Sequence, residues 1–216
     1  GGRGKLVFGF KDIFQFTTDP ASSEDVKFLP RYNNNMEAKA KYTPGEKISI
    51  GLAYRHIIEW YKAEHMQPYN YDRFIVTPTI YYNITPKTSL FLDTDLGKII
   101  YDTGDRDSIY LQISGGIIGQ VAPKTSIHFK AGSQMRNYQH GDLYRDYIAI
   151  TTKGILSSQL RKDVSMRLTF TKDAVESIYQ NNPYLDLKQA DLELIKNLTG
   201  KISIMAGGTF GRSDYA

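Results

Sequence analysis

Residues 122–138, Ala-Pro-Lys-Thr-Ser-Ile-His-Phe-Lys-Ala-Gly-Ser-Gln-Met-Arg-Asn-Tyr, carry the pattern that decides the fold. After a turn at Pro123, the apolar residues Ile127, Phe129 and Met135 occupy alternate positions, and polar side chains fill most positions between them. A period of two residues is typical of a β-strand, whose side chains point alternately to opposite faces. Such runs here last roughly 10–14 residues, whereas strands usually have about 5–6. The stretch therefore predicts a long strand with one apolar and one polar face.

The same unit occurs five times along the chain. Each copy has a turn, then a serine, then an aliphatic residue, and successive serines lie 37–40 residues apart. Each period has room for two long strands, one tight turn and one longer polar connection, so the repeat indicates a series of β-hairpins. The serines are Ser49, Ser89, Ser126, Ser165 and Ser203.

This repeat predicts about eleven strands in an antiparallel, up-and-down arrangement. Tight turns and longer loops alternate along the chain, so we expect the tight turns on one rim and the loops on the other. The predicted strands are 4–17, 33–43, 47–62, 72–84, 88–101, 107–121, 125–138, 145–158, 163–178, 184–197 and 200–214. The predicted tight turns are at Pro44, Pro86, Pro123, Arg161 and Gly200.

Composition narrows the class of protein. The 216 residues are 41% hydrophobic and 23% charged, which excludes collagen, low-complexity disorder and a coiled coil. The chain has no cysteine, so disulfides and thiolate metal sites are excluded. A net charge of +4 without a basic run argues against a nucleic-acid partner. No run of 18 apolar residues predicts a membrane helix, and a barrel of alternating strands is polar on average.

Strand length and number favour a transmembrane β-barrel in the bacterial outer membrane. Membrane strands need about 9–11 residues, and a propeller or soluble sandwich would have much shorter ones. A soluble up-and-down barrel closes with about eight strands. We expect residues 1–216 to form a single barrel domain of an all-β protein. The chain begins without a signal sequence, so we expect a partial or processed chain whose complete form has twelve or more strands.

Aromatic residues near the predicted strand ends suggest the interfacial girdles of such barrels, although tyrosine is also common in strands generally. If the girdle is present, these side chains face the lipid headgroups. The residues are Tyr42, Trp60, Tyr61, Tyr81, Tyr82, Tyr101, Tyr110, Tyr138, Tyr147, Tyr179 and Tyr184.

The alternation also predicts which side chains face lipid and which face the interior. Apolar members of each run should point outward, and their polar neighbours should line a hydrated lumen with charges of both signs. The predicted outward residues include Ile50, Leu90, Ile127, Phe129, Leu168 and Ile204. The predicted lumen-lining residues are Lys39, Lys41, Arg55, Asp93, Asp95, His128, Lys130, Gln134, Arg136 and Arg167.

Several motifs resemble a known family. They are the turns at 85–90 and 122–127, the run Lys172–Ser177, the segment Asn181–Tyr184 and the closing Arg212–Tyr215. Together they resemble the outer-membrane β-barrel porin family found beside exopolysaccharide and exosortase loci, from about Asn35 onward. The resemblance implies an outer-membrane location and a pore or export role, and it supplies no catalytic residues.

Catalytic and metal-binding motifs are not evident. The four histidines include no pair at metal-binding spacing, and the glycines at 115–119 lack the lysine of a phosphate loop. Asp93, His128 and a serine are the residue types of a catalytic triad. A single histidine among many polar lumen residues, however, does not favour a catalytic site. We therefore expect no enzyme activity, no cofactor and no metal site.

Two functions remain open. The first is passive passage or export of a hydrophilic solute or polysaccharide through the lumen, with Arg136, Lys130 and Arg167 on one stretch of wall giving a modest anion preference. The alternative is a barrel that anchors or holds a partner protein, or joins further chains in an assembly, without conducting. Membrane lipid is a partner in both cases.

Overall fold

A computed structural model describes residues 4–18, 30–104, 106–139, 146–176 and 184–215. Eleven long strands form one sheet in chain order, and a 3₁₀ helix, Glu64–Tyr69, lies between two of them. The strands are β1 (Lys5–Thr17), β2 (Arg31–Thr43), β3 (Ile48–Tyr61), β4 (Tyr71–Thr85), β5 (Thr88–Tyr101), β6 (Ser108–Ala122), β7 (Thr125–Tyr138), β8 (Tyr147–Gln159), β9 (Val164–Glu176), β10 (Tyr184–Asn197) and β11 (Ser203–Tyr215).

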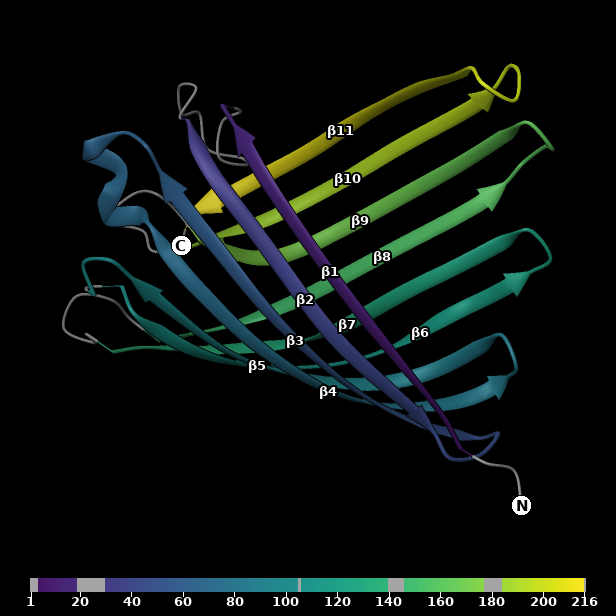
Figure 1. Cartoon of the computed structure of the whole chain (residues 1–216), viewed down its shortest axis with the longest axis horizontal. Helices are drawn as coiled ribbons and strands as arrows, with labels where there is room; N and C mark the ends of the chain where they lie inside the picture. The colour runs from purple at the N-terminus through teal and green to yellow at the C-terminus, as the bar shows by residue number, and fades with distance from the viewer. Residues whose placement is uncertain (1–3, 19–29, 105, 140–145, 177–183, 216) are drawn as a thin grey trace.

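Every neighbouring pair of strands is antiparallel, which confirms the all-β, up-and-down fold. The tight turns lie together on one rim, and the strand ends that lead into the longer connections lie on the other, as the repeat predicts (Figure 1). The largest difference from the predicted bounds is at β11, which begins at Ser203 rather than at residue 200. Leu198 and Thr199 donate backbone hydrogen bonds to the carbonyl of Ile202, so residues 198–202 complete the turn first.

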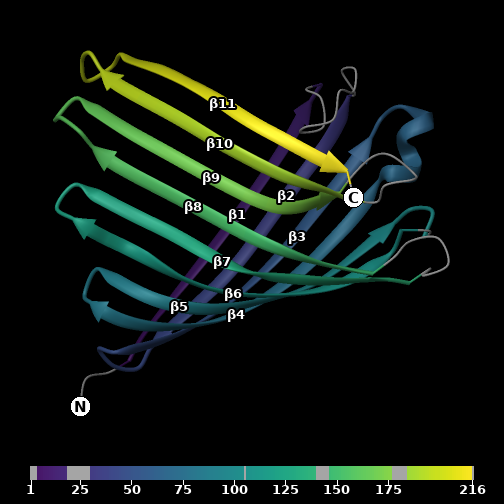
Figure 2. The same ribbon diagram turned by 180° about the vertical axis from the view of Figure 1, so that it is seen from behind.

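The sheet curls into two facing walls. In Figure 1, β1–β3 cross in front of β6–β11, and Figure 2 shows the same crossing from behind. Strands β4 and β5 lie where one wall turns into the other. Among the described residues, β1 pairs only with β2, and β11 pairs only with β10. Because β1 and β11 both run from the turn rim to the loop rim, antiparallel closure requires an odd number of further strands. Twelve or more strands in a closed barrel stays a prediction, and this geometry agrees with it.

Burial alternates along the strands. In β5, Asp93 and Asp95 are 8% and 6% exposed. Leu92 and Leu96, on the other face of the same strand, are 54% and 51% exposed. The register carries this phase across the sheet, because Asp93 lies opposite Ser114, which is also buried. Side chains of opposite residues in an antiparallel ladder share a face. One face is therefore buried and the other exposed over most of the sheet.

The exposed face is apolar, as predicted. Ile50, Leu90, Phe129, Leu168 and Ile204 are all exposed on it, and Ile127 is half-buried on the same face. Soluble monomers rarely expose an apolar patch larger than a few hundred Å². Further exposed residues of this face are Leu6, Phe8, Phe10, Leu52, Ile80, Leu92, Leu96, Ile109, Ile113, Met135, Ile148, Ile150, Phe170, Leu192 and Phe210.

We predict that Phe129→Arg destabilises the protein in lipid vesicles. A charge on the lipid face costs about 2–4 kcal/mol near the bilayer midplane, because the guanidinium loses its hydration there. The free energy of unfolding from vesicles measures this cost. Ser126→Arg, on the opposite face of the same strand, is the matched control and should be close to neutral. Equal costs for the two variants would contradict the assignment of the outer face.

Candidate functional site

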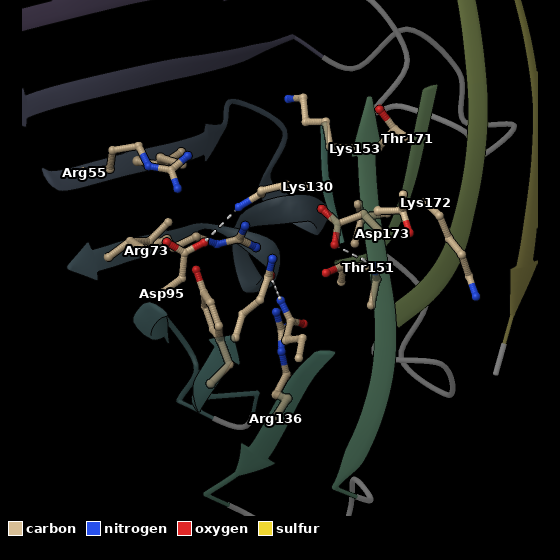
Figure 3. A pocket seen from close by; sticks show the side chains of 18 residues that line it. Arg55, Arg73, Asp95, Lys130, Arg136, Thr151, Lys153, Thr171, Lys172 and Asp173 are labelled. Atoms are coloured by element: carbon tan, nitrogen blue, oxygen red, sulfur yellow. Dashed lines mark hydrogen bonds and ion pairs between the residues drawn. The ribbon is translucent and has the colours of Figure 1, made fainter. Parts of the chain in front are cut away.

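The buried face lies on the concave side of the curled sheet. Its side chains come from seven strands, β3 to β9, and surround one cavity of about 200 Å³. Only the inward face of a strongly curved sheet can bring side chains from so many strands around a single space. The charged and amide residues that line it are Arg55, Arg73, Asp95, Gln112, Lys130, Gln134, Arg136, Lys153 and Asp173 (Figure 3). Lys172 also borders the cavity, but its ammonium is turned away, toward Asp186 on the outer face.

Strand register places all ten predicted lumen residues on this same face. Five of them line the cavity itself, and the other five lie elsewhere on the face. Lys130 of β7 links neighbouring carboxylates, with Nζ 3.5 Å from Asp93 Oδ2 and 3.8 Å from Asp95 Oδ2. The five at the cavity are Arg55, Asp95, Lys130, Gln134 and Arg136.

Side-chain hydrogen bonds within and between strands hold the cavity wall. Gln134 Nε2 donates to Gln112 Oε1 at 3.2 Å, and Gln112 Nε2 donates to Ser114 Oγ at 3.1 Å. The hydroxyl of Tyr147 donates to Gln134 Oε1 at 3.1 Å. All four side chains are buried, and buried polar groups are costly unless they are paired. This network therefore fixes the wall from β6 to β8.

Tyrosine and arginine side chains pack together toward the loop rim of the cavity. The Arg136 guanidinium lies 5.2 Å from the Tyr110 ring centroid and 5.6 Å from that of Tyr147, within cation–π range. Tyr147 in turn stacks on Tyr184 at 3.7 Å between centroids. Arg136 is 2% exposed, so this cluster fills and narrows the interior near the loops.

The predicted aromatic girdle is wrong for six tyrosines. Five are buried on the inner half of the structure, and Tyr81 is half-buried on the inward phase of β4, opposite the buried Phe91. They belong to the inward phase of their strands, and position near a strand end does not determine which face a side chain takes. Tyr42, Trp60 and Tyr82 are exposed on the outward face, as a girdle requires, and Tyr179 lies outside the described residues. The five buried residues are Tyr61, Tyr101, Tyr110, Tyr138 and Tyr147.

Arg167 does not join Arg136 and Lys130 as predicted. It lines a different hollow nearer the turn rim, together with Lys124, Ser157 and Glu193. The alternation gives the correct face for Arg167, but its position along the strand depends on the stagger between hairpins. The sequence does not show that stagger.

The remaining predicted lumen residues lie apart from the cavity. Lys41 Nζ lies 4.0 Å from the Tyr81 ring centroid, and Lys39 Nζ is 2.7 Å from Glu37 Oε2. The His128 ring meets the edge of Phe91. These groups form no single cluster with the cavity residues.

Sequence reasoning missed Arg73 as a cavity residue. It lies on the inward phase of β4 beside Ile75, and the run Phe74-Ile75-Val76 is apolar on both faces, which hides the alternation. Ile75 is 3% exposed because it packs with Ile99 and Tyr110 inside the curl. Thr77 and Thr79 are inward-facing polar residues of β4, and every second residue before them takes the same face. Counting back from them in steps of two residues is the sequence signal that would identify Arg73.

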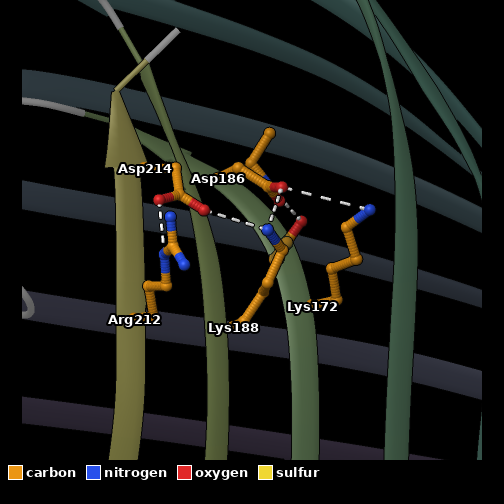
Figure 4. Close-up of polar contacts among 7 residues, drawn as sticks. Lys172, Asp186, Lys188, Arg212 and Asp214 are labelled. Carbon is orange, nitrogen blue, oxygen red and sulfur yellow. Dashed lines mark hydrogen bonds and ion pairs between the residues drawn. The ribbon is translucent and has the colours of Figure 1, made fainter.

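The outer face carries a second group of charges, near the loop rim of the last three strands (Figure 4). Lys188 Nζ lies 3.0 Å from Asp214 and 3.3 Å from Asp186, Arg212 Nε lies 2.7 Å from Asp214, and Lys172 lies 4.0 Å from Asp186. Toward the turn rim, the same face of β9–β11 is apolar. The outward face thus changes from apolar to charged before the strands end.

Within the described residues, no three histidine or acidic side chains are grouped as metal ligands. No helix in that part of the chain is long and apolar enough to cross a membrane.

Several solved structures match the chain over most of its length. The translocator domain of the autotransporter NalP from Neisseria meningitidis matches with a TM-score of 0.42 and 11% identity, over 98% of this chain and 83% of that chain. The Ralstonia pickettii toluene transporter TbuX matches with a TM-score of 0.43 and 8% identity, over 100% of this chain and 78% of that chain. No protein-family model and no curated protein sequence matches the chain. Similarity at this level does not bear on what either face of the sheet binds.

We predict that Gly97→Ala disrupts the tyrosine–arginine cluster. A Cβ atom at this position would lie 2.1 Å from two atoms of the Tyr110 ring, so the ring must move away from its contact with Arg136. Overpacking of this kind costs about 1–3 kcal/mol, measured as the free energy of unfolding. Tyr110→Ala in the same chain should remove most of the added cost, giving a non-additive double-mutant cycle.

Gly208→Ala is the matched control, because nothing lies within 4 Å of a Cβ atom there. The interpretation would be contradicted if the double-mutant cycle were strictly additive, or if Gly208→Ala lowered the free energy of unfolding as much as Gly97→Ala. Either result would show that the Tyr110 ring does not need the space that Gly97 leaves.

Proposed function

We propose that this chain forms a bacterial outer-membrane β-barrel channel for hydrophilic solutes. The observation that carries the proposal is the division of one curved sheet into an apolar outward face and a charged inward face. In water this division leaves a large apolar surface exposed, whereas in a bilayer both faces are matched to their solvents. The mechanism is diffusion along a wet, charge-lined interior, and it includes no catalytic step and no cofactor.

The outward features are consistent with this placement. Trp60 and Tyr82 are exposed at opposite rims, where interfacial aromatic residues are expected. The charged group around Lys188 lies at the loop rim, where lipid headgroups and water would solvate it. A closed barrel of twelve or more strands is part of the proposal.

The inward features favour selection of solutes by charge. Five cationic side chains point into the cavity against two lining carboxylates, so the local potential favours anions. Export of an exopolysaccharide would fit the family that the turn motifs resemble. Polysaccharide export is thus the more specific form of the proposal, and those motifs alone support it.

A scaffold barrel that holds a partner without conducting is the second candidate. The packing of Arg136 between Tyr110 and Tyr147 favours it, because this cluster narrows the interior near the loop rim. A filled interior conducts poorly even in a closed barrel.

Planar-bilayer recordings of the complete protein test the channel. We expect stable conductance with a modest preference for anions at low salt, declining at high salt as the fixed charges are screened. Arg136→Ser should reduce the preference, whereas Arg167→Ser, which changes a different hollow, should reduce it less. Insertion without any current would refute the channel and favour the scaffold.

A further inference from the structure

We propose that the inward cavity is a saturable binding site for one dianionic oxyanion, such as sulfate, phosphate or a dicarboxylate. The inference deepens the proposed function, since it places a defined binding step inside the lumen. It goes beyond a general anion preference, which requires only an average excess of positive charge along the wall.

The first argument is the local charge. Arg55, Arg73, Lys130, Arg136 and Lys153 come from four strands, and Figure 3 shows their charged ends turned toward one space, with Lys172 turned away. Two carboxylates line the same cavity, at Asp95 and Asp173. Asp93 adds a third carboxylate beside the cavity, with Oδ2 3.5 Å from Lys130 Nζ. Five cations against three carboxylates leave an excess of two positive charges, which matches one dianion. Partial enclosure strengthens the attraction relative to bulk water.

The second argument is the restraint and the shape of the guanidinium groups. Arg136 Cζ lies 5.2 Å and 5.6 Å from the ring centroids of Tyr110 and Tyr147, and Arg73 Cζ lies 5.5 Å from that of Tyr71. These aromatic neighbours restrict the two side chains, and a guanidinium carries planar N–H groups that match paired oxygens. Less side-chain freedom is then lost on binding. This geometry favours a group with two or more anionic oxygens over a spherical ion such as chloride.

The third argument is the remaining wall and its size. Thr151 is buried at the cavity and offers a neutral hydroxyl donor. The amide nitrogens of Gln112 and Gln134 each have a second N–H beyond the one that they donate within the wall. A volume of about 200 Å³ is below the roughly 300–1,000 Å³ of pockets that hold drug-sized ligands, so the site takes one small group. That group is either a free anion or an anionic substituent on a longer chain, and the chemistry recognised is the same.

The other basic inward residues do not form an equivalent site. Lys39 has an exposed side chain paired with Glu37, and Arg167 shares its hollow with Glu193. They therefore provide controls that change the charge of the inner face without changing the cavity.

Equilibrium dialysis with radiolabelled sulfate tests the inference on the folded protein in detergent at low ionic strength. We expect saturable binding of one sulfate per chain, competed by phosphate and much less by chloride. Arg55→Gln and Lys153→Gln should each weaken binding roughly ten-fold, the loss expected for a charge-assisted hydrogen bond. Arg55→Lys, which keeps the charge but loses the planar donor pair, should have an intermediate effect. Arg167→Gln is the matched control and should change the affinity less than about two-fold.

Competition by oligosaccharides distinguishes the two sources of the anion. If a sulfated oligosaccharide displaces the bound sulfate and its neutral counterpart does not, the ligand is an anionic substituent on an oligosaccharide. If only free dianions displace the sulfate, the ligand is the free ion. Non-saturable binding, equal competition by chloride, or equal losses in Arg167→Gln and Arg55→Gln would overturn the site. Dialysis does not depend on conductance, so a conducting protein without this binding refutes only the site. Sulfate binding without current refutes only the channel.

Discussion

The structure depends on the coupling between strand geometry and solvent. A strand sends alternate side chains to opposite faces, and in a continuous antiparallel sheet the register passes that phase from strand to strand. Leu92 and Asp93 are adjacent in sequence, yet Leu92 lies on the apolar outward face and Asp93 lies on the charged inward face. A shift of one residue in any ladder would put carboxylates among the apolar side chains. The two-residue period therefore sets both the fold and the division of its faces.

Curvature turns the polar face into a site. A flat sheet would spread Arg55 and Lys153 over five strands' separation, whereas the curl brings both to one cavity. Close approaches such as that of Tyr110 to Gly97 allow bulky side chains to fill the concave side. The resulting interior is uneven, with the cationic cavity bounded toward the loops by the tyrosine–arginine cluster. This unevenness gives the inner face a specific binding site within a generally hydrated surface.

The sequence predicts the strands and faces well because both follow from local periodicity. It locates Arg136 and Lys130 on the correct face, since the run from Ile127 to Met135 alternates without interruption. It does not predict that Arg167 lies in another hollow, because the stagger of hairpins is a property of the whole sheet. The place of Tyr101 and Tyr110 near strand ends suggests the lipid interface, but their phase turns both side chains inward. Arg73 was missed where apolar residues occupy both faces of β4.

The central claim is the orientation of the two faces, and a single-cysteine scan along β5 tests it most directly. The chain has no native cysteine, so each label reports one position. In vesicles, Asp93→Cys and Asp95→Cys should react with a water-soluble maleimide through the lumen, whereas Leu92→Cys and Leu96→Cys should react only with a lipid-soluble reagent. This account predicts alternation with a period of two residues in that sense. The reverse phase, or uniform reactivity at all four positions, would contradict it.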